Sequence, residues 1–155
     1  MLTNDRDVTV LNSLIATVLD SIDGYQKAAQ DADNSRFAQI FNDRARERQG
    51  VVGDLQAAVA RAGGNPEDDG TALAGAHRAF MGLKEAVMGR DDTAIIAEVE
   101  RGEDHIKSKF EAALAETELS PTAREAVQTA WSSVKQGHDQ ISALKHGLEG
   151  TASAY

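Results

Sequence analysis

Apolar residues recur at alternating steps of three and four along much of the chain, and this spacing restricts the fold to packed helices. The clearest run lies near the N-terminus and consists of Val8, Leu11, Ile15, Val18, Ile22, Tyr25 and Ala29. Residues three and four apart share one face of a helix, so this run predicts a seam that faces other helices, as in bundles. A chain of 155 residues with 2 prolines suits one helical domain, which we expect over residues 1–150.

Short breaks divide the chain into helices, which we expect at about 4–31, 36–62, 93–116 and 121–150. Asn34 or Ser35 is a natural N-cap for the second helix. The run 63–66, Gly-Gly-Asn-Pro, ends that helix with a left-handed glycine and a proline. Ser120 followed by Pro121 suits the start of the last helix. Residues 151–155 are expected to form a flexible C-terminal tail.

The segment 71–88 is also amphipathic, and as a helix it would measure ~27 Å, about one bundle length. The short breaks near 33 and 119 predict two antiparallel hairpins, so this segment can carry the chain from one end of the bundle to the other. The alternative is one long helix over 71–116, kinked at Gly89. The predicted fold is all-α: a ferritin-like four-helix bundle with an additional crossover helical segment at about 71–88.

Polar residues interrupt the apolar stripes at one height of the predicted bundle. Glu103 and His138 each fall in a stripe that is otherwise apolar, and a buried charge is costly unless it has a partner. Folding each hairpin about its turn brings further polar residues to that height, Asp20 and Glu100 among them. The predicted buried polar layer consists of Asp23, Arg44, Arg48, Glu103 and His138. We expect Arg44 and Arg48 to pair with Asp23 and Glu103, and His138 to join by a hydrogen bond.

Glycines inside the predicted helices mark the same height. They are Gly24, Gly50, Gly102 and Gly137, and each costs ~1 kcal/mol of helix stability relative to alanine. They indicate either close packing of helices or a small ligand pocket. The other histidines are expected outside the layer. His77 should pack on the apolar face of 71–88, while His105 and His146 fall on polar faces and are expected to be solvated.

The layer can also be interpreted as a metal site with Glu103 and His138 as ligands. Ferritin-like carboxylate sites take a Glu from each of two helices and Glu-x-x-His from each of the other two. In this chain Lys135 stands where the Glu before His138 would be, and the second helix has no histidine. Arginines at this height would also repel dications. We therefore expect no cofactor and no catalytic residue, with iron or manganese as the alternative.

Composition and charge restrict the partners. The formal charge of −9 disfavours nucleic acid, because phosphate binding needs basic patches. The sequence has no long apolar run, so no membrane partner is expected. The N-terminal sequence MLTNDRDVTV is polar and lacks a signal-peptide core, which favours a cytoplasmic protein. Without cysteine there can be no disulfide framework and no thiolate metal site.

Several short segments of the chain carry a family resemblance: 10–15, 23–25, 64–66, 75–78, 83–84, 91–95, 100–104 and 134–141. The most specific parts are Glu-Arg-Gly-Glu-Asp at 100–104 and His-Asp-Gln-Ile at 138–141. Together, over about residues 7–148, they resemble an uncharacterised bacterial family of ferritin-like four-helix-bundle proteins, known as a domain of unknown function. The resemblance implies the fold and supplies no established activity.

Three functional hypotheses follow from the sequence. The first is a non-enzymatic binding or stress-associated protein, whose small-molecule ligand is unknown. The second is a non-haem di-metal oxidase or peroxide-handling protein that uses iron or manganese. The third is a structural homo-oligomer. We favour the first, because Glu103 can stay ionised by pairing with an arginine and needs no metal.

Overall fold

The computed structural model describes residues 5–67 and 92–153, with side chains described as far as Gly147. Its helices are α1 (Asp5–Asp31), α2 (Ser35–Arg61), α5 (Asp92–Leu114) and α6 (Pro121–Ser153). Four helices without strands in the described part of the chain confirm the predicted all-α bundle. The expected helical segment at 71–88, its His77, and the choice between a crossover and a kinked helix lie outside the described residues.

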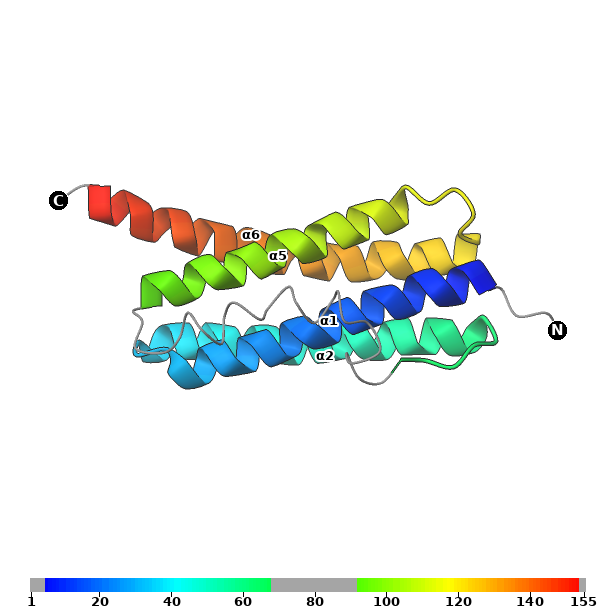
Figure 1. Ribbon diagram of the computed structural model, residues 1–155, viewed down its shortest axis with the longest axis horizontal. Coiled ribbons are helices and arrows are strands. Elements are labelled where there is room, and N and C mark those ends of the chain that lie inside the picture. Colours follow the sequence, from blue (N-terminus) through cyan, green and yellow to red (C-terminus); the bar gives the residue numbers. More distant parts are fainter. Residues whose placement is uncertain (1–4, 68–91, 154–155) are drawn as a thin grey trace.

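The helices form two antiparallel hairpins that lie one above the other along a common long axis (Figure 1). One hairpin is α1 with α2, and the other is α5 with α6. Between the hairpins, α1 packs against α5 and α2 packs against α6. In cross-section, α2 and α5 therefore lie diagonally opposite each other. A contact between these two helices has to cross the middle of the bundle.

The local start and stop signals work as the sequence predicts. The Asn34 side chain caps α2 by accepting a 2.8 Å hydrogen bond from the Arg36 N–H. Gly63 has φ 85°, the left-handed conformation expected after α2. The Ser120 hydroxyl accepts a 3.1 Å hydrogen bond from the Ala123 N–H at the start of α6. The last helix ends at Ser153, three residues beyond the expected end near Gly150. A single glycine without a following proline costs only ~1 kcal/mol and does not stop a helix.

The core is built from the predicted stripes. In α1 the seam is buried from Leu11 to Tyr25, and only its outer members Val8 and Ala29 are partly exposed. Every helix contributes fully buried aliphatic or aromatic side chains, among them Leu11, Ile15, Phe41, Leu55, Ile96, Ile106, Phe110, Val127, Val134 and Ile141. The apolar core therefore extends along the whole bundle, and apolar side chains lie both above and below its middle.

Each hairpin turn is held by a carboxylate from the other hairpin. Asp92, the first residue of α5, accepts hydrogen bonds of 2.9 Å from the backbone N–H groups of Asp33 and Asn34. At the other end, the buried Asp7 of α1 accepts bonds of 2.9 and 2.6 Å from the N–H and hydroxyl of Ser120. A carboxylate at a helix N-terminus is favourable, because helix N–H groups there lack partners. These contacts fix the two hairpins at a defined height relative to each other.

The residues that flank the undescribed stretch lie at opposite ends of the bundle. The Glu67 N–H donates a 2.8 Å hydrogen bond to Asn12, in the first half of α1. Asp92 instead binds the turn that follows α1. At 1.5 Å per residue these two points are ~30 Å apart along α1.

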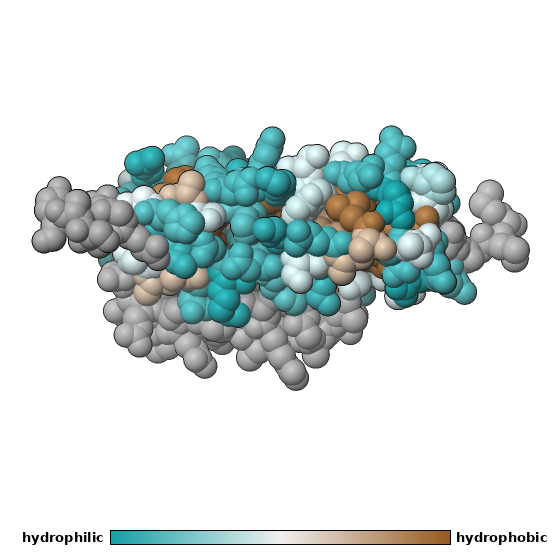
Figure 2. Space-filling view, turned by 90° about the horizontal axis from the view of Figure 1, so that it is seen from above, coloured by the Kyte–Doolittle hydropathy of each residue, from teal (hydrophilic) through white to brown (hydrophobic). Residues whose placement is uncertain are grey.

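The outer face of α5 and α6 is mainly hydrophilic, with small separate hydrophobic areas between polar side chains (Figure 2). Across the described ranges 5–67 and 92–153, no helix is both long enough and apolar enough to cross a membrane.

Candidate functional site

A fully buried ion pair crosses the middle of the bundle. Arg48 lies on the inward stripe of α2 and Glu103 on that of α5, and both side chains are 0% exposed. Arg48 Nη2 donates a 2.8 Å hydrogen bond to Glu103 Oε2. Because α2 and α5 are diagonal, this contact joins the two hairpins through the core and not over the surface.

Hydroxyl groups from α1 complete the surroundings of this pair. The Tyr25 hydroxyl donates a 2.6 Å hydrogen bond to Glu103 Oε1, so both carboxylate oxygens accept a bond. Arg48 Nη1 donates to Ser21 Oγ at 3.3 Å. The Arg48 guanidinium also lies 5.6 Å from the centre of the Tyr25 ring, within range of a cation–π contact. We call Ser21, Tyr25, Arg48 and Glu103 the central cluster.

The electrostatics keep the cluster as an ion pair with a neutral tyrosine. Burial, reinforced by the negative charge of Glu103, raises the pKa of Tyr25 well above its ordinary value. Burial is the largest single influence and by itself would lower the pKa of Arg48. The charge and hydrogen bond of Glu103, together with contributions from Tyr25 and Glu47, outweigh it, so the pKa of Arg48 lies above its ordinary value. Arg48 is therefore a permanent cation in the centre of the bundle.

Helix α6 contributes a glycine at this height. A Cβ atom on Gly137 would lie 2.7 Å from Arg48 Nη2 and 2.8 Å from Arg44 Cδ. Real Cβ atoms do not approach this closely, so the arginine side chains occupy the room that a side chain at 137 would need. Of the two alternatives for the glycines, the contacts at Gly137 fit close packing, here of two arginine side chains against α6. Gly50 differs, because a Cβ there would meet nothing within 4 Å.

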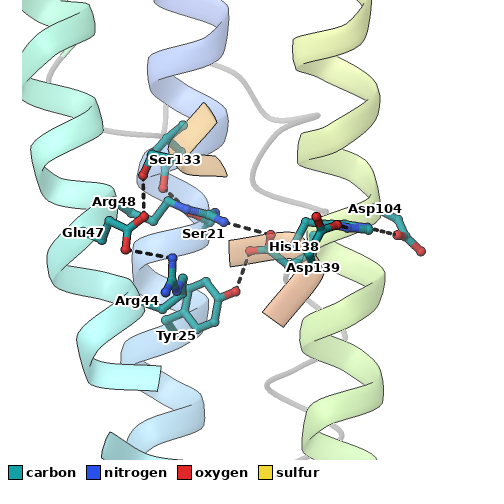
Figure 3. A network of polar contacts seen from close by, with 11 residues as sticks. Ser21, Tyr25, Arg44, Glu47, Arg48, Asp104, Ser133, His138 and Asp139 are labelled. Carbon is teal, nitrogen blue, oxygen red and sulfur yellow. Dashed lines mark hydrogen bonds and ion pairs between the residues drawn. The ribbon is translucent and has the colours of Figure 1, made fainter. Parts of the chain in front are cut away.

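Two further polar groups flank the central cluster on opposite sides (Figure 3). Toward α6, Glu47 of α2 pairs with Arg44 at 2.8 Å and accepts a hydrogen bond from the Ser133 hydroxyl. Toward the α5–α6 surface, His138 Nε2 lies 2.8 Å from the exposed carboxylate of Asp104. The polar residues at this height thus form a fully buried central cluster with a partly exposed ion pair on either side.

The structure corrects three details of the predicted layer. Asp23 is exposed and lies outside it, since on α1 the residues Ile22 and Tyr25 point inward and Asp23 is turned away between them. Arg44 pairs with Glu47 of its own helix, not with Asp23 or Glu103. His138 has 12% of its side chain exposed and bonds Asp104, so it does not join the Glu103 network.

Other polar residues at this height or near it fall in different places. Asp20 is buried, with 3% exposure. Glu100 pairs with Lys145 at 2.9 Å. His105, expected to be solvated, is partly buried, and its Nε2 atom has no hydrogen-bond partner within the described structure. Burial and the nearby cations Lys109 and Arg101 lower the pKa of His105. His146 is exposed, as expected.

The sequence analysis assigned Tyr25 to an apolar seam and did not single out Ser21, so it missed the polar roles of both residues. For Tyr25 a signal was available, because a tyrosine hydroxyl that is buried nearly always needs a hydrogen-bond partner. For Ser21 no pattern in the sequence distinguishes a buried hydroxyl from a solvated one.

The residues of the central cluster do not fit a ferritin-like metal site. Such a site collects carboxylates and histidines from four inward-facing helices. At this height the inward-facing residues are Tyr25, Arg48, Glu103 and Gly137. They include one carboxylate, that of Glu103, and each of its oxygens already accepts a hydrogen bond. In residues 5–67 and 92–153 no three His, Cys, Asp or Glu side chains come close enough to hold a metal ion. A dication bound to Glu103 would lie beside the Arg48 guanidinium, which already pairs with that carboxylate.

Comparison of the sequence with known protein families identifies the family of this chain. Residues 6–116 match the family described as Domain of unknown function (DUF2383), which is more than half of the chain. The chain belongs to this family, and the expected membership of an uncharacterised family is confirmed. The matched range contains Tyr25, Arg48 and Glu103 and ends before Gly137. No curated protein matches the chain.

Proposed function

We propose that this chain is a ferritin-like bundle that acts without a metal, as a non-enzymatic binding or stress-associated protein. The single observation that carries the proposal is the 2.8 Å ion pair between Arg48 and Glu103, both fully buried. In a ferritin-like arrangement the bundle centre holds metal ligands from all four helices. In this chain a guanidinium supplies the positive charge that balances the central carboxylate.

The balance of charges at the centre of the bundle supports the proposal. Arg48 neutralises Glu103, and Arg44 pairs with Glu47 beside it. A dication placed in the cluster would need further anionic ligands, and it would lie next to an arginine that stays protonated.

The experiment is metal retention by the full-length protein. The protein is loaded with iron(II) under anaerobic conditions, or with manganese(II), then desalted and analysed for metal content. We expect wild type to retain far less than one metal per chain. Asp139→Ala is the matched control, since it removes an exposed carboxylate next to His138. Two metal ions per wild-type chain, lost in both Glu103→Ala and His138→Ala, would refute the proposal and favour a di-metal oxidase.

A cytoplasmic location and a bacterial origin belong to the same proposal. The first agrees with a sequence that contains no cysteine, and the second rests on the family resemblance.

A further inference from the structure

Two of the three nitrogens in the head group of Arg48 have hydrogen-bond acceptors, while the buried Nε has no hydrogen-bond partner within the described residues. A carboxylate oxygen of Glu103 lies 2.8 Å from Nη2, and the Ser21 hydroxyl lies 3.3 Å from Nη1. The ring of Tyr25 lies 5.6 Å from the central carbon of the guanidinium. A guanidinium combines planarity, several N–H donors and weak hydration, so it suits a site of this composition better than an ammonium or a hydrated metal ion does.

The shape of the site on the α6 side points to the same class of cation. Gly137 leaves open the volume that the Nη2 end of the guanidinium fills, with only 2.7 Å between that nitrogen and the position of a Cβ. The site therefore accommodates the lateral extent of a guanidinium as well as its charge.

We infer that the centre of the bundle is a binding site for a guanidinium-type cation, and that Arg48 is its resident, covalently tethered occupant. The inference rests on the proposed function, because it takes the central cation to be organic and not a metal. The walls of the site are Glu103, Tyr25, Ser21 and the backbone at Gly137. Without the Arg48 side chain, the same walls bind a free alkylguanidinium ion.

The test is chemical rescue of the full-length Arg48→Ala variant. Its thermal unfolding is followed by circular dichroism in millimolar guanidinium or n-propylguanidinium chloride, with sodium chloride at equal ionic strength as reference. We expect the melting temperature of the variant to rise with ligand concentration and to saturate, because a ligand that binds only the folded state stabilises it by mass action. If the variant is unfolded at the start, the same titration is read as recovery of helical signal.

Other small molecules test the selectivity. Ammonium chloride supplies charge without the planar fork, urea supplies the planar shape without charge, and manganese(II) represents a metal. None of these is expected to raise the melting temperature of Arg48→Ala. Wild type is not expected to respond to guanidinium at these concentrations, because Arg48 already fills the site.

Two variants control for location. Arg44→Ala removes an arginine one turn away that pairs with the partly exposed Glu47 of its own helix, and it should show no rescue. Arg48→Ala combined with Glu103→Gln removes the carboxylate and should lose the rescue. Absence of any guanidinium effect on Arg48→Ala, or an equal effect of manganese(II), ammonium or urea, would overturn the inference. Metal retention by wild type would instead refute the proposed function, so the two failures are distinguishable.

Discussion

The Tyr25 hydroxyl and the Glu103 carboxylate, 78 residues apart in the sequence, meet in a 2.6 Å hydrogen bond at the centre of the bundle. This bond leaves Glu103 with a partner on each oxygen, the second being Arg48. It also connects α1 with α5, while the ion pair connects α2 with α5. One carboxylate thus joins three helices, and the stability of the bundle should respond strongly to changes around it.

Tyr25→Phe keeps the ring and removes only the hydroxyl. We expect a loss of about 1.5–3 kcal/mol in the free energy of unfolding, the range for a hydrogen bond to a charged group. Urea denaturation followed by circular dichroism measures it. Ser21→Ala is the comparison, and it should cost less because the Ser21–Arg48 contact is longer, at 3.3 Å. Equal losses for the two variants would contradict the central role of the Tyr25 hydroxyl.

Glu103→Ala leaves the buried Arg48 without its counter-charge. Breaking a buried ion pair from one side costs about 3–5 kcal/mol, so a large fall in melting temperature is expected. Asp104→Ala, at the next position but with 64% of its side chain exposed, should cost less than ~1 kcal/mol. His138→Ala should also cost less than Glu103→Ala, because the partner of His138 is this exposed carboxylate. An unchanged melting temperature in Glu103→Ala would mean that Glu103 is not buried.

Replacing both charges tests whether the ion pair itself stabilises the fold. Arg48→Met combined with Glu103→Leu removes the unpaired charge that either single change leaves behind. Buried ion pairs can often be replaced by apolar residues at little cost, so we expect the double variant to be more stable than Glu103→Ala. Calorimetry or urea denaturation of both variants decides this. A double variant as unstable as Glu103→Ala would show that the cost arises from lost packing and not from the stranded charge.

Gly137→Ala and Gly50→Ala make the same change in two environments. Alanine is favoured over glycine inside a helix by about 1 kcal/mol, and at Gly50 a Cβ meets no atom within 4 Å, so Gly50→Ala should raise the melting temperature. At Gly137 the Cβ would lie 2.7 Å from Arg48 Nη2, so Gly137→Ala should lower it. Stabilisation by both variants would show that Arg48 can move away at no cost.

Asp7→Ala removes the carboxylate that holds the start of α6. The expected loss is about 0.5–2 kcal/mol, the range for a helix N-cap. Amide hydrogen exchange in the first turn of α6 should become faster, because the Ser120 N–H loses its 2.9 Å bond to Asp7. Asp5→Ala, an exposed acid in the same turn of α1, is the control and should leave this exchange unchanged.

His105 should make stability depend on pH. Its pKa is lowered in the folded protein from an ordinary value of 6.5, so near and below that pH the unfolded chain binds more protons. The free energy of unfolding should therefore rise with pH up to about that value and fall as the pH decreases below it. His105→Gln should reduce the difference between urea denaturation at acidic and neutral pH, while the exposed His146→Gln should not. An identical pH dependence in His105→Gln and wild type would contradict the lowered pKa.

The sequence by itself determined where the four described helices lie and that the fold is all-α. Spacing of three and four fixes which face of each segment is apolar, and Asn34, Gly63 and Ser120 act through bonds and dihedral angles within a few residues. Such local signals do not depend on the rest of the fold, so they can be read from the chain directly. The burial of Glu103 and Arg48 was predictable for the same reason, since each lies on an apolar stripe.

Only the tertiary structure decided which polar groups meet. Placing Asp23 in the layer required the rotation of α1 about its axis, and a difference of one residue turns a side chain by about 100° and so from core to solvent. The partners of Arg44 and His138 depend on distances of a few ångströms between helices, which periodicity does not specify. Tyr25 became a polar partner of Glu103 because α1 and α5 pack side by side. The position of Gly137 has little room for a side chain because two arginines fill the space beside it. These relations belong to the packing of four helices at one height, and no single helix contains them.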